Sequence, residues 1–167
     1  MAVIDNTFET KGTHLFFIDD ISNTDGVVTK LTCPTGITGL NAGPKDKIPT
    51  DCLDDESPFH QYIGGKATPT ELAIPFILYK GDGSHQTLFE LFKSGKVIGW
   101  YCGLSDASSA PTIADTDGLT LTSPTDRTGF SFTGYVSNLA IDVAQNEIVR
   151  GLLNINPRSA FIPHWAA

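Results

Sequence analysis

The sequence predicts a mainly β fold, a β-sandwich or barrel with one flanking α-helix. The chain of 167 residues contains 16 Gly and 10 Pro, and only 18% of its residues are charged, which favours short strands joined by turns. Residues 27–32 alternate with period two, as a half-buried strand does, and one segment, residues 85–95, shows convincing helical spacing. We expect one domain over residues 1–167, because this length supports a single hydrophobic core.

A nearly continuous apolar run at residues 71–79 predicts a buried strand at the centre of the fold. The run is too short to span a bilayer and is bounded by charged residues. Pro75 lies within it and has no N–H to donate. We therefore expect one side of this strand to be unpaired, or a bulge at Pro75.

The helix is predicted directly after this strand, at residues 85–95. Asp82 or Ser84 can cap its first turn, and Gly95 can adopt the left-handed conformation that ends a helix. Its large apolar residues lie on one face, so we expect all of them to pack on the sheet as the core of the helix: Leu88, Phe89, Leu91 and Phe92.

The other elements follow from the same patterns. Residues 1–12 predict a flexible N-terminal arm with Gly12 as its hinge, and residues 158–167 predict an aromatic C-terminal tail that docks on the body. Strands are predicted at residues 13–21 and 27–32, paired as a hairpin through a turn at 22–26, and then at residues 96–102, 119–122, 129–143 and 147–155, with turns at 123–127 and 145–146.

Residues 33–70 differ in composition from the rest of the chain. They are rich in Pro, Gly, Asp and Lys, and their apolar residues are irregularly spaced. We expect short strands near residues 36–40 and 47–53, and a long inter-strand loop over residues 40–66 that extends from the body. A loop of this length in a small domain is usually functional or ordered by a partner.

Charge and cysteine content exclude several classes of protein. The net charge is −8 and the 11 Lys and Arg residues are scattered, which disfavours tight nucleic-acid binding. Cys33, Cys52 and Cys102 form no CxxC pair and are most simply free thiols in a reducing cytoplasm. We expect neither a secretory signal nor a membrane-spanning segment.

No active-site motif is evident, and we expect no enzyme, cofactor or metal. The four His residues lack metal-binding spacing. The acidic run from Asp54 to Glu56 does not fit a calcium loop and is typical of a solvated surface. Cysteine–histidine catalysis would require folding to bring a pair such as Cys102 and His60 together.

Three features occur in an order that resembles a known family. A hydrophobic strand at residues 72–79 precedes a helix at 87–92; Leu53-Asp54-Asp55-Glu56 lies in the long loop; and a late hairpin joins residues 134–137 to 147–154. The sequence from residue 30 to 158 resembles the major tail tube proteins of long-tailed, non-contractile bacteriophages of the lambda type. It differs from the lambda pattern in ending at Ala167 without an added immunoglobulin-like domain.

This resemblance implies a structural virion protein, located in the tail and assembled in the bacterial host cytoplasm. Copies would form hexameric rings whose inner strands join into one barrel, and the rings would stack around a tape-measure protein. Tail terminator and tail-tip proteins would be further partners. Genomic DNA would later pass through the bore into the host without specific binding, which suits an acidic chain. No membrane binding is implied.

The resemblance also implies contacts between subunits and rings, made by the long loop, the arm and the tail. We expect Asp54 and Asp55 to meet cations on a neighbouring ring. The full set of expected contact residues is Asp46, Lys47, Leu53, Asp54, Asp55, Glu56, Phe59 and Trp165.

Two other classes of function remain open on the sequence alone. One is a different tail component on a related fold, such as a terminator or baseplate hub, or the tube protein of a type VI secretion system. The other is a carbohydrate-binding β-sandwich, which would need exposed aromatic residues. Its candidates would be Trp100, Tyr101 and Trp165.

Overall fold

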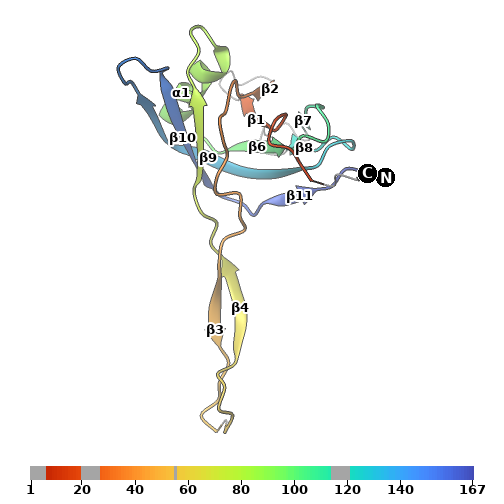
Figure 1. Ribbon diagram of the computed structural model, residues 1–167. Helices are drawn as coiled ribbons and strands as arrows, with labels where there is room; N and C mark the ends of the chain where they lie inside the picture. Colours follow the sequence, from red (N-terminus) through yellow and green to blue (C-terminus); the bar gives the residue numbers. More distant parts are fainter. Residues whose placement is uncertain (1–6, 20–26, 55, 114–120) are drawn as a thin grey trace.

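A computed structural model describes residues 7–19, 27–54, 56–113 and 121–167 and confirms a mainly β fold (Figure 1). Within these residues the chain forms a seven-stranded antiparallel sheet, two small two-stranded sheets and one helix. The large sheet has the order β2-β1-β6-β9-β10-β5, with β11 also paired to β9. Its strands are β1 His14–Asp19, β2 Val27–Lys30, β5 Leu72–Ile77, β6 Ile98–Gly103, β9 Gly129–Asp142, β10 Arg150–Pro157 and β11 Ile162–His164.

Most strands lie where periodicity places them. β1 and β2 pair as the expected hairpin, with Phe17 opposite Thr29, while the turn expected at 22–26 lies outside the described residues. β9 and β10 form the late hairpin, and Asn146 adopts positive φ (61°) in the turn between them. The weak strand expected at 119–122 is found as β8 Leu121–Thr122, while residues 119–120 lie outside the described residues; β8 pairs with β7 Thr112–Ile113, which was not predicted.

Residues 31–38 connect the two edges of the large sheet. The Leu31 N–H donates to the Leu15 carbonyl of β1 (2.9 Å), whereas the Thr38 N–H donates to the Ala73 carbonyl of β5 (3.0 Å). β1 and β5 stand near opposite ends of the strand order, so the sheet must curl for one short segment to bond to both. The strand expected at 36–40 is thereby reduced to two isolated bridges to β5, at Pro34 and Thr38.

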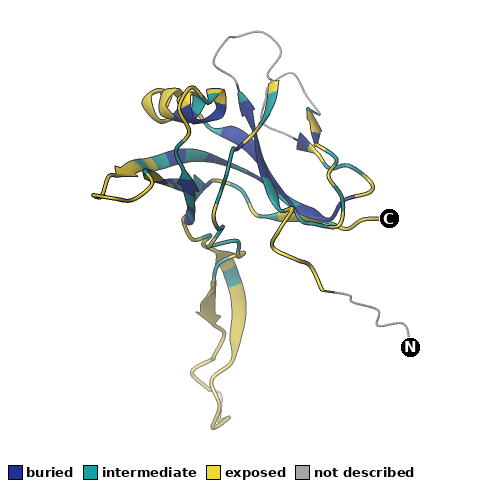
Figure 2. Cartoon of the chain, turned by 45° about the horizontal axis from the view of Figure 1, so that its top comes forward, coloured by how far each residue is buried: buried dark blue, intermediate teal, exposed yellow. Residues whose placement is uncertain are grey.

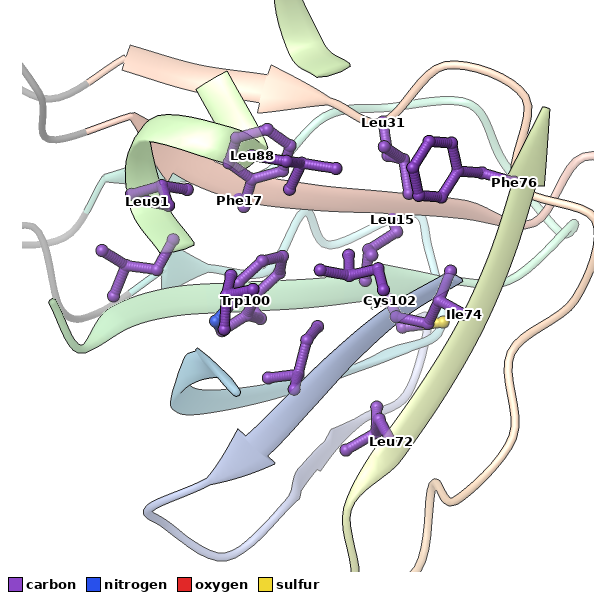
Figure 3. Close-up of a cluster of buried hydrophobic side chains, with 14 of the residues drawn as sticks. Leu15, Phe17, Leu31, Leu72, Ile74, Phe76, Leu88, Leu91, Trp100 and Cys102 are labelled. Atoms are coloured by element: carbon purple, nitrogen blue, oxygen red, sulfur yellow. The ribbon is translucent and has the colours of Figure 1, made fainter. Parts of the chain in front are cut away.

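The curled sheet encloses the main core (Figure 3). Side chains of β1, β5, β6 and the helix point toward one another, and Phe17, Phe76 and Trp100 are among the large aromatic members of this core. The strand predicted from the apolar run is present as β5, but only alternate residues, Leu72, Ile74 and Phe76, are buried, and the residues between them are half-exposed. The space is tight, because a Cβ at Gly151 would lie 2.3 Å from the Phe76 ring.

Pro75 lies on the outer edge of the sheet, as predicted. Its carbonyl accepts the Thr35 N–H (2.8 Å) on the side where residues 33–38 run, so its missing N–H also falls on that side. The β10 side of β5 keeps an unbroken ladder through Ile74 and Phe76. A proline is tolerated here because it removes no bond between β5 and β10.

The helix α1, Gly83–Ser94, begins and ends as predicted. The Asp82 carboxylate accepts the N–H groups of Ser84 (2.9 Å) and His85 (3.3 Å), and Gly95 adopts the left-handed conformation with φ of 64°. Capping bonds to this carboxylate lower the pKa of Asp82, although burial opposes them. Each cap satisfies backbone groups that the end of a helix leaves unpaired.

The prediction that four apolar residues of α1 pack on the sheet is wrong for two of them. Leu88 and Leu91 are buried, but Phe89 and Phe92 are 36% and 42% exposed. Polar residues of the first turn, Ser84 and His85, face the body instead. The physical reason is hydrogen bonding: the His85 ring accepts from the Tyr79 N–H (3.3 Å) and donates to the Thr32 carbonyl (3.0 Å), which satisfies both ring nitrogens of a buried imidazole.

The C-terminal tail docks through β11 and Phe161, as its aromatic content predicted. β11 pairs with the start of β9, and the Phe161 ring packs edge-on against Phe132 with centroids 4.8 Å apart. A second buried cluster on the other face of β1 and β6 contains Phe16, Ile18, Tyr101 and Leu121. The small β7–β8 sheet contributes Leu121 and therefore covers this face.

Arg127 is fully buried and ties several loops together. Its guanidinium donates to the carbonyls of Gly12, Gly103, Leu104 and Ser109 at 2.8–3.0 Å and to Nδ1 of His14 at 3.1 Å. The central carbon of the guanidinium, Cζ, lies 5.6 Å from the centre of the Phe16 ring. Burial lowers the pKa of Arg127, but the carbonyl dipoles replace the water that the cation loses. The sequence interpretation placed Arg127 in a turn and missed this role.

His14 predicts a pH dependence of stability. Partial burial, together with the positive charges of Lys30 and Arg127, lowers its pKa below the ordinary value of about 6.5. Below about pH 6.5, His14 binds a proton more readily in the unfolded chain than in the folded chain, which favours unfolding. The contribution of His14 to the free energy of unfolding is therefore complete above about pH 6.5 and is lost as the pH falls. In urea unfolding between pH 7.5 and 5, His14→Asn should lose less stability than the wild type. Equal losses would contradict this assignment.

Candidate assembly surfaces

A β-hairpin projects from the body where the long loop was expected (Figure 1). Its strands are β3 Lys45–Pro49 and β4 Tyr62–Ala67, with the tip at residues 50–61. The segment expected as a long loop, residues 40–66, contains this hairpin, and β3 overlaps the strand expected at 47–53. The second strand, β4, was not predicted, because Gly64 and Gly65 interrupt its apolar pattern.

Both faces of this projecting hairpin are exposed (Figure 2). Ile48 lies directly opposite Ile63 on one face, whereas Tyr62 lies opposite Pro49 on the other. The Lys47 ammonium sits 5.8 Å from the centre of the Tyr62 ring. An isolated two-stranded hairpin is at best marginally stable in water, so these apolar residues point to a partner that covers them.

The hairpin tip carries the most exposed apolar side chains of the described residues. Leu53 is fully exposed and Phe59 is 78% exposed. The carboxylate of Asp51 joins the two sides of the tip at its base. It accepts the Gln61 N–H (2.7 Å) and lies 2.6 Å from His60 Nδ1. These two contacts lower the pKa of Asp51. The tip thus presents exposed apolar side chains within an acidic segment, since residues 50–61 contain four carboxylates and no Lys or Arg.

The expected contact residues fall into two places. Asp46 and Lys47 lie on β3, and Leu53, Asp54, Glu56 and Phe59 lie at the tip, all of them exposed. The structure therefore brings these six together on one hairpin. Asp55 lies outside the described residues, and Trp165, 71% exposed, lies on the C-terminal tail. The sequence interpretation left Ile48, Tyr62 and Ile63 out of this set, although large apolar residues among charged ones were a usable signal.

A second group of exposed apolar residues lies on the end of the β9–β10 hairpin. Two of them lie on the strands and two in the connection between the strands, and the sequence interpretation did not single them out. They are Ile141, Val143, Ile148 and Leu152.

The structure removes most of the residues that the alternative functions would need. Of the three aromatic candidates for carbohydrate binding, Trp100 and Tyr101 are completely buried and only Trp165 on the C-terminal tail is exposed, so no platform of several aromatic rings is formed by them. Cys102 is buried, and burial raises the pKa of its thiol to about 11, while His60 lies at the hairpin tip, so the two do not form a catalytic pair. Among the described residues we find no cluster of His, Cys, Asp or Glu able to hold a metal ion. Their one helix is too short and too polar to cross a membrane.

A β-rich body with a projecting hairpin of exposed apolar residues is typical of a subunit of a larger assembly. The family model of the lambda-like phage tail tube protein (TTP) matches residues 6–166, and the chain belongs to that family. This agrees with the resemblance noted in the sequence. The chain is a structural phage tail tube protein of the virion, and the family consists of tube subunits, not enzymes.

Known proteins agree with this assignment. The chain is 32% identical to "Structural protein 3" of Pseudomonas phage PAJU2 over 152 residues, covering 90% of this chain and 89% of that protein. Its fold matches the SPP1 tail tube with a TM-score of 0.63 at 12% identity, over 95% of this chain and 79% of that one. It also matches the tail of an empty gene transfer agent particle of C6 symmetry, with a TM-score of 0.62 at 9% identity, over 93% and 98%.

Proposed function

We propose that this tail tube protein assembles as hexameric rings that stack into a hollow tube, through which DNA is ejected into the host. The single observation that carries the proposal is the projecting hairpin with apolar residues exposed on both faces. The C6 symmetry of the similar gene transfer agent tail supports six copies per ring. Closure around a ring also removes exposed sheet edges, which are otherwise sites of uncontrolled association.

The outward face of β9 and β10 is a candidate lining for the bore. β7 and β8 cover the sheet face over β1 and β6, whereas the polar positions Asn138 and Asn154 stand opposite each other at the other end. Arg150 is opposite Asp142, so their charges balance. Between these two pairs, Leu152 stands opposite Ala140, so the face is mixed in character and Arg150 is the one cation of the three pairs. A surface without clustered cations would let DNA slide past, because tight binding needs several Lys or Arg contacts to phosphate.

Partners beyond the protein itself follow from this role. A tape-measure protein would occupy the bore during assembly, and terminator and tail-tip proteins would close the two ends. Assembly would take place in the cytoplasm of the bacterial host. These partners would meet surfaces that a stack of rings leaves open at its ends.

The test of the proposal is assembly of the purified protein. Negative-stain microscopy at rising protein concentration should show hollow tubes with six-fold rings in cross-section. A sample that remains monomeric at every concentration and salt condition would contradict the proposal. Closed single rings that never stack would instead favour a terminator-like component.

Charge reversal at the tip should weaken assembly. We expect Asp54→Lys combined with Asp55→Lys to raise the protein concentration needed for tube formation about tenfold, because two exposed ion pairs contribute on the order of 1.4 kcal/mol together. Light scattering gives this concentration, and circular dichroism checks the fold. Glu90→Lys with Gln86→Lys is the control: it adds positive charge at two exposed positions of α1, away from both the tip and the end of the β9–β10 hairpin. An unchanged threshold in the tip variant would remove Asp54 and Asp55 from the interface.

A further inference from the structure

A cavity of about 480 Å³ opens at the root of the projecting hairpin. It lies between the end of the N-terminal arm, the segment of residues 34–40 and the end of β6. We call it the root pocket; its lining includes Thr10, Lys11, Ile37, Leu40, Cys102 and Leu104. Lys11 is the one charged residue among the described residues that line it, so the pocket is an apolar hollow with a cationic rim.

The walls of the root pocket are held in place by contacts already described. Arg127 bonds the Gly12 carbonyl (3.0 Å), which fixes the backbone between Lys11 and Thr13. On the opposite wall, Thr35 and Thr38 are bonded to β5. A cavity with both walls anchored is preformed, so filling it costs little ordering of the chain.

The chain's own hairpin tip cannot fill this pocket. The segment that lines it continues from Leu40 through residues 41–44 into β3, so the pocket lies beside the start of the hairpin, whereas Leu53 and Phe59 belong to the connection at the other end of β3 and β4. Figure 1 shows this hairpin projecting from the body. The two surfaces nevertheless match in character. The tip offers two exposed apolar side chains within an acidic segment, and the pocket offers an apolar hollow beside Lys11.

We propose that the root pocket of one copy receives the hairpin tip of a second copy, with Leu53 and Phe59 in the hollow and Asp54 or Glu56 near Lys11. This inference rests on the proposed function and names the contact by which the tube extends. A pocket of this volume has room for one or two large side chains. The second copy is favoured over an unrelated partner because the chain itself carries a segment of matching apolar character and opposite charge.

A tip-to-root contact has a geometric consequence. It joins two different surfaces of identical copies, so it is heterologous and repeats without closing, as a stacked tube requires. The extended chain from Leu40 to Leu53 spans at most about 45 Å, which sets an upper limit on the axial repeat between successive rings. A longer repeat measured by microscopy would contradict the contact.

Cysteine cross-linking tests the proposal, because Cys52 is already exposed at the tip. Thr10→Cys, Lys11→Cys and Thr35→Cys each place a thiol on the rim of the root pocket. Assembled samples are oxidised, denatured and separated without reductant, and the wild type gives the background. We expect at least one rim variant to give a ladder of disulfide-linked chains, and Cys52→Ser in the same variant to abolish it. Glu90→Cys, on the exposed face of α1, is the matched control.

The outcomes separate the two proposals. Tubes without a ladder in any rim variant would overturn the root-pocket contact and leave the tube function standing. A ladder as strong with Glu90→Cys as with the rim variants would also overturn it, because the tip would then contact another surface. The absence of tubes under all conditions would overturn both. A charge swap gives an independent check: Lys11→Glu and Asp54→Lys should each weaken assembly, and their combination should restore it.

Discussion

Replacing Arg127 with methionine is expected to lower the free energy of unfolding by about 4 kcal/mol, a large loss for a domain of this size. The substitution removes the N–H donors that Arg127 supplies to four backbone carbonyls, among them those of Gly12 and Leu104. A lost partner in a buried site costs about 1–3 kcal/mol for each group left unsatisfied, although water can re-enter near His14 and reduce the total. Urea unfolding followed by the fluorescence of buried Trp100 measures the change.

A matched variant separates the hydrogen bonds from the charge. Arg127→Lys keeps a cation but loses the planar fork that reaches four carbonyls at once, so it should cost about 2 kcal/mol. Measurements belong below the concentration at which tubes form, because assembly adds stability to the folded state. A loss under about 1 kcal/mol for the methionine variant would show that these carbonyls find other donors.

Local patterns predicted the elements whose structure is set locally. The helix caps at Asp82 and Gly95 follow from short-range chemistry, and both occur as expected. The strand around Pro75 was placed because an uninterrupted apolar run needs a buried site, and its position at an edge follows from the missing N–H. In each case the atoms that decide the structure lie within a few residues of one another.

Features decided by distant contacts were missed. β4 pairs with β3 across the long tip although its glycines break the pattern. The exposure of Phe89 and Phe92 depends on His85, which takes a buried position by bonding to Thr32 and Tyr79. Nothing in the residues around Arg127 shows that the carbonyl of Gly12, remote in sequence, will be its acceptor.

One part of the candidate contact could be predicted from the sequence, and the other part could not. Resemblance to a family placed the tip residues, and the structure gathers those that it describes on one hairpin. The root pocket was beyond prediction, because its lining comes from segments around residues 10, 37 and 103 that become neighbours only through the curled sheet. Interfaces depend on such assembled surfaces, so the sequence indicated the projecting side of the contact and gave no sign of the receiving side.

Removing the apolar side chains of the tip should have the largest effect on assembly. In Leu53→Ser combined with Phe59→Ser, we expect the concentration needed for tube formation to rise about a thousandfold. Burial of a Leu or Phe side chain contributes roughly 1.5–3 kcal/mol, so two together contribute about 4 kcal/mol per contact. Both residues are exposed in the single chain, so its fold and unfolding free energy should change little. Light scattering against concentration, with microscopy of the products, measures the threshold.

The control for this variant keeps the apolar area while changing the same positions. Leu53→Met with Phe59→Tyr should form tubes within a few fold of the wild-type concentration, because comparable side-chain volume remains to be buried. If the serine variant assembled as readily as this control, the tip would not be buried in the tube. The exposed residues Ile141, Val143, Ile148 and Leu152 at the end of the β9–β10 hairpin would then be the next surface to test. If both variants failed to assemble, the contact would depend on a close fit of the native side chains and not on buried apolar area alone.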